Sequence, residues 1–224
     1  MEHYGSVISE RRTYGDGCSS AHALDLVGDR WALLIVRDLL FGPKRFSDLQ
    51  VGLPHGSPNV LTQRLRELES SGVVHRRRLP PPASANVYAL TEWGRQLEPI
   101  LLGLQRWGAG SPSFSPDVPV GCDAAMLALK NAFDGTEAGD LAMVAEVRFP
   151  LGTFGVTVRN GSINISRGPA ESPDLTLETD PSTLEHLVFL GETVDDAERQ
   201  GDLVVHGDRT LVHRFFDLFP VPTA

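Results

Sequence analysis

The chain has 224 residues, which is enough for two domains of ordinary size that each bury a core. Its content of 41% hydrophobic and 22% charged residues is typical of a soluble globular protein, and no apolar run of about 18 residues could span a bilayer. The first residues lack the apolar stretch of a signal peptide, so we expect a cytoplasmic protein without a membrane partner. Two cysteines, Cys18 and Cys122, are too few for a disulfide framework or a zinc cluster.

The charge is distributed unevenly along the chain. Residues 1–115 hold 13 Lys and Arg against 11 Asp and Glu, a net charge of +2, whereas residues 116–224 hold 7 against 18, a net charge of −11. The most basic stretch, residues 43–95, has 8 basic and 4 acidic side chains. A basic patch on an acidic chain is suited to binding a polyanion such as nucleic acid.

Two helices are predicted first, over residues 18–27 and 30–40. Gly28 is expected to end the first helix with a positive φ, and Asp29 is expected to cap the second. The apolar face of the second helix is expected to be buried, and it consists of Trp31, Leu34 and Ile35.

A short helix beginning at Phe46 and a longer helix over residues 58–70 follow. Ser57 suits the N-cap of the longer helix, Pro58 its first position, and Gly72 the position just past its end. Residues 73–79 and 86–90 then read as the two strands of a hairpin. A last helix begins at Thr91 and should bend at Pro99, which lacks a backbone donor.

The second half of the chain predicts an α+β fold with a mostly antiparallel sheet. Helical spacing over residues 123–133 gives way to alternating strands, and Asn160-Gly161 predicts a type I′ hairpin turn. A helix is expected from Pro181 to Gly191, followed by a short helix, a strand and an apolar last helix. The region between the halves is rich in Gly, Ser and Pro, so we predict domains at 1–110 and 122–224 joined by a linker at 111–121.

The helix over residues 58–70 has a polar face whose side chains are of the types that contact DNA bases. At about 100° per residue its leucines gather on one side, while Asn, Thr, Gln and Arg gather on the other. Asn and Gln can pair with adenine, Arg with guanine, and the Thr methyl group can contact thymine. Basic residues before the third helix and on the hairpin would hold phosphates. The predicted DNA-binding residues are Lys44, Arg45, Ser57, Asn59, Thr62, Gln63, Arg66, Arg76, Arg77 and Arg78.

The alternative is an ordinary solvated helix face beside a solvated strand edge. The three-helix order, the basic hairpin and the linker together favour binding to double-stranded DNA.

The motifs "GDRW", "RFSDL", "LTQRLRELESSGVV" and "YALTEWG" resemble the winged helix-turn-helix domain of the HxlR-type, MarR-like transcription regulators. The resemblance runs from about Tyr14 to Gly108. It implies a homodimer on a pseudo-palindromic operator, in which the N-terminal helix and the helix ending at Trp107 form the dimer contact. Leu101, Leu104 and Trp107 are apolar and suit that contact. The alternative, which the sequence favours equally, is that these side chains pack into the core of their own domain. The hairpin turn "LPPPASANVY" is longer than is usual in the family.

Cys18 coincides with a cysteine of this family that senses oxidants or electrophiles in some members. Such a thiol must be partly exposed and have a lowered pKa. A buried structural cysteine is the alternative.

The second half, above all "LTLETDPSTLEHLVFLGETVDDAERQGDLVVHGDRTLVHRFFDLF", resembles the sterol carrier protein 2 type of lipid-binding domain. The resemblance implies an apolar chamber for a hydrophobic small-molecule effector. A solid core is the alternative use of the residues expected to line it, which are Phe154, Val156, Leu184, Val188, Phe215 and Phe219.

Catalytic motifs are missing from the sequence. Its seven histidines form no HExxH motif and no metal-ligand spacing, and the sequence contains no P-loop and no GxGxxG, so we expect neither an enzyme nor a cofactor or metal site. Together with the two resemblances, the sequence predicts a homodimeric transcriptional repressor whose operator binding is modulated by a hydrophobic small molecule. Our hypothesis for the direction is that the molecule releases the dimer from DNA. The alternatives are a redox or electrophile sensor acting through Cys18, and a lipid carrier in which the winged helix only dimerises.

Overall fold

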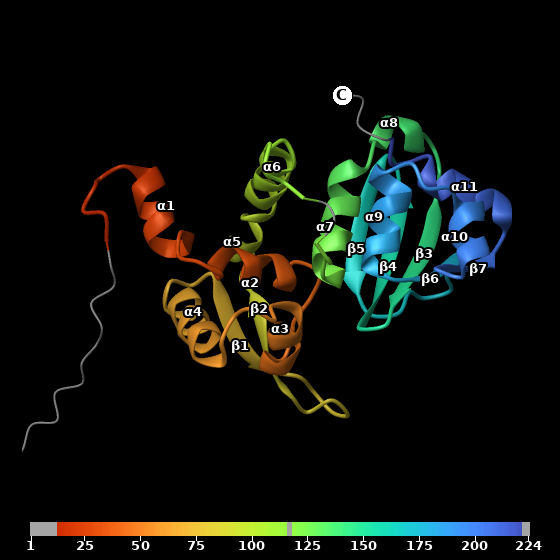
Figure 1. Cartoon of the computed structure of the whole chain (residues 1–224). Coiled ribbons are helices and arrows are strands. Elements are labelled where there is room, and N and C mark those ends of the chain that lie inside the picture. The colour runs from red at the N-terminus through yellow and green to blue at the C-terminus, as the bar shows by residue number, and fades with distance from the viewer. Residues whose placement is uncertain (1–12, 116–117, 221–224) are drawn as a thin grey trace, which may run out of the picture.

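The computed structural model describes residues 13–115 and 118–220, which form two groups of elements lying side by side (Figure 1). The first group surrounds a two-stranded hairpin, and the second surrounds a five-stranded sheet. Among the helices of these residues, none is both long and apolar enough to cross a bilayer.

The first group has the element order predicted from the sequence, with one helix divided in two. Its elements are α1 (Ser19–Val27), α2 (Ala32–Leu39), α3 (Phe46–Gly52), α4 (Pro58–Ser70), β1 (Val74–Arg78), β2 (Asn86–Leu90), α5 (Glu92–Arg95) and α6 (Glu98–Ala109).

The turn between α1 and α2 differs from the prediction. Gly28 has a φ of −76°, and the positive φ, of 79°, belongs to Trp31, the residue before α2. The Asp29 side chain does not cap α2 but forms an ion pair with Arg64 of α4. Leu34 was predicted to be buried but is exposed, whereas Ile35 is fully buried.

Local signals at α4 and α6 are confirmed more closely. The Oγ of Ser57 accepts a hydrogen bond from the backbone of Val60 at 3.4 Å, and Gly72 follows the helix with a φ of 74°. The helix expected to bend at Pro99 is interrupted just before it, because α5 ends at Arg95 and α6 starts with Pro99 in its first turn.

The second group is an α+β arrangement. Its elements are α7 (Cys122–Ala132), α8 (Gly135–Ala138), β3 (Met143–Phe149), β4 (Gly152–Arg159), β5 (Ser162–Arg167), β6 (Leu175–Thr179), α9 (Pro181–Phe189), α10 (Val194–Gln200), β7 (Leu203–Gly207) and α11 (Arg209–Phe216).

The strand order is β5-β4-β3-β6-β7, and within this sheet only β3 and β6 run parallel, so the predicted mostly antiparallel sheet is confirmed. Asn160 and Gly161 join β4 to β5 with φ values of 52° and 65°, which are the values of a type I′ turn. Helices α7 and α9 pack together, while α10 and α11 contact β7 (Figure 1).

The two groups share one continuous apolar core. Helix α7 contacts both α2 and α6. Phe41 follows α2, and its ring contacts the ring of Phe154 on β4 edge to face, with ring centroids 5.9 Å apart. The backbone carbonyl of Phe41 accepts a hydrogen bond of 2.7 Å from the backbone N–H of Arg167. Aromatic contact and a backbone hydrogen bond thus hold the segment between α2 and α3 against the large sheet.

Candidate nucleic-acid interface

Helix α4 presents a polar face to solvent. Asn59, Gln63 and Arg66 are exposed, and Thr62 between them is half-buried. The opposite face holds the helix to the core, because its three leucines are each at most 1% exposed: Leu61, Leu65 and Leu68. The amphipathic pattern places the predicted base-reading side chains outward, with Ser57 exposed at the N-terminal end.

The hairpin adds exposed positive charge beside α4. Arg76, Arg77 and Arg78 are all exposed, and the Arg76 guanidinium lies 5.4 Å from the ring centroid of Tyr88 on β2. Alternate strand residues face opposite sides, so Arg77 points away from the side that carries Arg76 and Arg78. Figure 1 shows the hairpin, α3 and α4 at one end of the first group, and α6 at the other end.

The cations of this region fall into two classes. Within residues 13–115 and 118–220, no ion pair neutralises Arg45, Arg66 or the three hairpin arginines. Arg64, on the same helix as Arg66, is instead paired with Asp29 and Glu67. Charge that no carboxylate offsets remains available to phosphates.

Lys44 is a correction to the predicted set. Its backbone pairs with Tyr88 through hydrogen bonds of 3.0 and 2.8 Å, which ties the segment before α3 to β2. This pairing turns the Lys44 side chain inward, where it is 4% exposed and its Nζ pairs with Asp38 and Asp123. A buried and neutralised ammonium group has no surface for a phosphate, whereas the neighbouring Arg45 is exposed.

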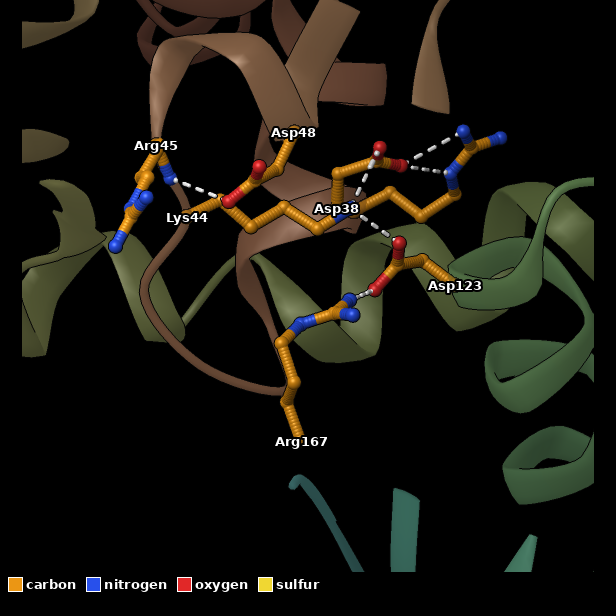
Figure 2. A network of polar contacts seen from close by, with 7 residues as sticks. Asp38, Lys44, Arg45, Asp48, Asp123 and Arg167 are labelled. Atoms are coloured by element: carbon orange, nitrogen blue, oxygen red, sulfur yellow. Dashed lines mark hydrogen bonds and ion pairs between the residues drawn. The ribbon is translucent and has the colours of Figure 1, made fainter. Parts of the chain in front are cut away.

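Lys44 belongs to a charged cluster at the junction of the two groups (Figure 2). Asp38 accepts hydrogen bonds from Arg37 at 2.8 and 2.9 Å and from the Nζ of Lys44 at 3.2 Å. Asp123, at the start of α7, pairs with both Lys44 and Arg167. Burial lowers the pKa of Lys44 and that of Arg167, because it disfavours their charged forms.

This junction cluster was not found from the sequence. The position of Asp38 in the apolar face of "ALLIVRDL" indicates that a charged residue is buried there. No residue close to it in the sequence identifies Lys44 as its partner. Asp123 is 79 residues from Lys44 and 44 residues from Arg167.

A separate apolar surface lies on α1 and α6. Val27 is the buried residue of the nine-residue helix α1, which exposes Leu24 at 51%. On α6, Leu101 is buried, whereas Leu104 is 43% and Trp107 is 80% exposed. Of the two uses predicted for these three residues, the intradomain core therefore describes Leu101 but not the other two.

Cys18 and Cys122 occupy opposite environments. Cys18 is exposed at the N-cap of α1, where the backbone N–H of Ala21 lowers the pKa of the thiol by stabilising the thiolate. Cys122 is half-buried, and burial raises the pKa of its thiol. Within the single chain, Cys18 is therefore not part of a buried core.

The six residues predicted to line an effector chamber lie in the core of the second group. Each is at most 3% exposed, and the rings of Phe215 and Phe219 are in contact with centroids 5.2 Å apart. One pocket of about 380 Å³ lies among α9, α10 and α11, and one of about 500 Å³ lies at the junction between the two groups. Neither pocket is lined by any of the six, so core filling, the alternative reading, describes their placement: Phe154, Val156, Leu184, Val188, Phe215 and Phe219.

Comparison with known protein families separates the chain into the same two regions. Residues 26–113 match the family described as HxlR-like helix-turn-helix, and residues 127–224 match the family described as alkyl sulfatase C-terminal. The second match names a different family from the predicted resemblance to sterol carrier protein 2. A solved structure of the sec-alkyl sulfatase PisA1 is 21% identical over 46% of this chain and 17% of that chain, with a TM-score of 0.42.

Bacterial regulators match the first region. The uncharacterized HTH-type transcriptional regulator YdeP of Bacillus subtilis is 38% identical over 96 residues, which are 42% of this chain and 73% of YdeP. The structure of the reduced form of the transcriptional regulator YodB from B. subtilis is 35% identical over 43% of this chain and 95% of that chain, with a TM-score of 0.39. With an outward polar face on α4, a basic hairpin and this extent of sequence identity, the chain belongs to the HxlR-like helix-turn-helix family.

Proposed function

We propose that this chain is a cytoplasmic, homodimeric transcriptional repressor that binds double-stranded DNA at a pseudo-palindromic operator. In this proposal residues 1–110 bind DNA and dimerise, residues 111–121 link the domains, and residues 122–224 contribute to binding a hydrophobic effector that releases the dimer from DNA. The observation that carries the proposal is the outward amide and guanidinium face of α4 beside arginines that no carboxylate of the described residues neutralises.

A gel shift with DNA from upstream of the chain's own gene tests the recognition helix. Arg66→Ala should weaken operator binding by about tenfold to a hundredfold, because one base contact contributes about 1–3 kcal/mol. Asn59→Ala should act in the same direction. The matched control is Arg95→Ala, which removes an exposed arginine from α5. Operator binding that neither Arg66→Ala nor Asn59→Ala changes would contradict the assignment of α4 as the recognition helix.

The apolar surface of α1 and α6 supports the homodimer. An isolated nine-residue helix is not stable in water, and α1 has few buried contacts within its own chain. Exposed Leu24, Leu104 and Trp107 are the side chains that a second copy would cover.

Trp107→Asp should therefore convert the dimer to monomers at micromolar concentration, because a buried tryptophan contributes at least about 2 kcal/mol to an interface. Light scattering coupled to gel filtration measures the mass directly. Leu190→Asp, which charges an exposed leucine after α9, should leave the dimer intact. If the Trp107→Asp variant is still a dimer, the dimer interface does not include Trp107.

The placement of Cys18 supports a second candidate, a regulator that responds to oxidants or electrophiles. Because its pKa is lowered and that of Cys122 is raised, Cys18 becomes thiolate at lower pH. Iodoacetamide at pH 7.5 should alkylate Cys18 about tenfold faster than Cys122, as peptide mass spectrometry would show. If Cys18 reacts no faster than Cys122, or if alkylated protein binds operator as well as a Cys18→Ser variant does, sensing through this thiol is wrong.

A further inference from the structure

The two pockets differ in what they offer to a hydrophobic molecule. The six residues predicted to line an effector chamber fill the core of the second group, and neither pocket reaches them. The pocket among α9, α10 and α11 is lined by three carboxylates and by no lysine or arginine, and an apolar molecule there would cover Glu192, Asp195 and Asp217 unfavourably. The junction pocket, of about 500 Å³, has the size of sites that hold small molecules.

The apolar walls of the junction pocket come from both halves of the chain. Val51 lies in the last turn of α3 and is 57% exposed, and Leu151 lies in the turn between β3 and β4 and is 73% exposed. A molecule that covered both side chains would remove apolar surface from water. The apolar side chains that line the pocket are Val51, Val120, Pro150, Leu151 and Pro181.

The charged side chains of this pocket balance one another. They are two cations and two carboxylates, Lys44 and Arg167 with Asp48 and Asp123. Both cations pair with Asp123 (Figure 2), and Asp48 accepts a hydrogen bond of 3.0 Å from the backbone N–H of Arg45. A charged ligand would give up its hydration for side chains that are already engaged, whereas a neutral molecule leaves their pairing intact.

The pocket also adjoins two helices that could transmit binding to DNA. Val51 belongs to α3, the helix that precedes α4. Cys122 begins α7, and at the other end of α7 Asn131 accepts a hydrogen bond of 2.8 Å from Arg106 of α6. A molecule in the pocket would therefore contact one helix next to α4 and one helix that holds the α6 surface.

We propose that the junction pocket binds a neutral, largely apolar small molecule. Its body contacts Val51 and Leu151 and covers the thiol of Cys122, which also lines the pocket. The effector site then lies between the two halves of the chain and not inside the core of the second. The role of this molecule as the effector rests on the proposed function, but its binding does not.

Fluorescence titration of the full chain with N-phenyl-1-naphthylamine, a neutral probe that emits strongly away from water, tests the pocket. The matched ligand is 8-anilino-1-naphthalenesulfonate, which adds one sulfonate to the same rings. We expect one site per chain and binding of the neutral probe at least about tenfold tighter, because the sulfonate must lose its hydration.

A charged side chain in the apolar wall tests the position of the probe. Val51→Glu should weaken binding of the neutral probe by about tenfold or more, because the probe would have to cover a carboxylate. Val51 is exposed, so the change leaves the core intact. Val204→Glu, the same change at an exposed residue of β7, should bind the probe as the wild type does.

Alkylation by N-ethylmaleimide locates the bound probe within the same chain. Cys122 is half-buried and lines the pocket, whereas Cys18 is exposed at the start of α1. Saturating probe should slow alkylation of Cys122 by about fivefold or more, because it blocks access to the thiol. Alkylation of Cys18 should be unchanged, as peptide mass spectrometry would show.

Four outcomes would each overturn the proposal: no binding of the neutral probe up to its solubility limit, equal binding of the sulfonate, wild-type binding by Val51→Glu, or unchanged alkylation of Cys122 in the bound chain. A chain that binds the probe over Cys122 but shifts no operator DNA contradicts only the proposed function. A chain that shifts operator DNA without binding the probe contradicts only this inference.

Discussion

A chain in which Arg76, Arg77 and Arg78 are all replaced by alanine should bind operator DNA about a hundredfold more weakly than the wild type at moderate salt. The three side chains are exposed on β1 and lack ion-pair partners within the described residues, so Arg76 and Arg78 on one side of the hairpin and Arg77 on the other are each free to hold a phosphate. Each lost phosphate contact also lowers the slope of log affinity against log salt by about 0.9. The slope should therefore fall by about 3.

Fluorescence anisotropy of a labelled operator over a salt series measures both quantities. The matched control is the triple variant of Arg95, Arg159 and Arg199 to alanine, which removes the same charge from exposed positions outside the hairpin. Equal losses in the two triple variants would show that net charge alone sets the affinity. An unchanged salt slope in the hairpin variant would place the hairpin away from the DNA backbone.

Asp123→Ala should lower the free energy of unfolding by about 3–5 kcal/mol. Asp123 is 4% exposed and pairs with Lys44 of the first group and Arg167 of the second. Its removal leaves Lys44 with Asp38 but deprives Arg167 of its ion partner in the described structure. A buried cation without compensation is far less stable than a solvated one.

Urea denaturation of the full chain measures the change. Asp195→Ala is the control, because Asp195 forms an exposed pair with Arg209 and such pairs contribute at most about 1 kcal/mol. If the two variants lose similar stability, the junction cluster is hydrated and does not hold the two halves together.

Elements with local signals were predicted well. The leucines of α4 recur at helical spacing, and the N-cap residue and the glycine lie at the two ends of the same segment. All of these signals predict the same helix. The Asn160-Gly161 turn is equally local, since both residues tolerate a positive φ and the turn needs no distant partner. Each of these features is decided by side chains within about one helical turn or one hairpin.

Apart from the φ of Gly28, the errors concern residues whose role depends on distant partners. Asp is a residue type that often caps helices, but the carboxylate of Asp29 pairs instead with Arg64, 35 residues later in the chain. Leu34 fits an apolar helix face, but the packing of the described residues leaves it 37% exposed. Lys44 stands in a basic run, and only packing against α7 shows that it is a structural cation.

The sequence by itself determined the order of helices and strands, the outward face of α4 and the charge of the hairpin, because periodicity, caps and turn residues act between neighbours in the chain. Only the tertiary structure decided which cations remain free for DNA and which are neutralised. Carboxylates far apart in sequence meet Lys44 and Arg167 at a junction that the packing of α2 and α7 creates, and burial there strengthens each pairing and removes those charges from solvent.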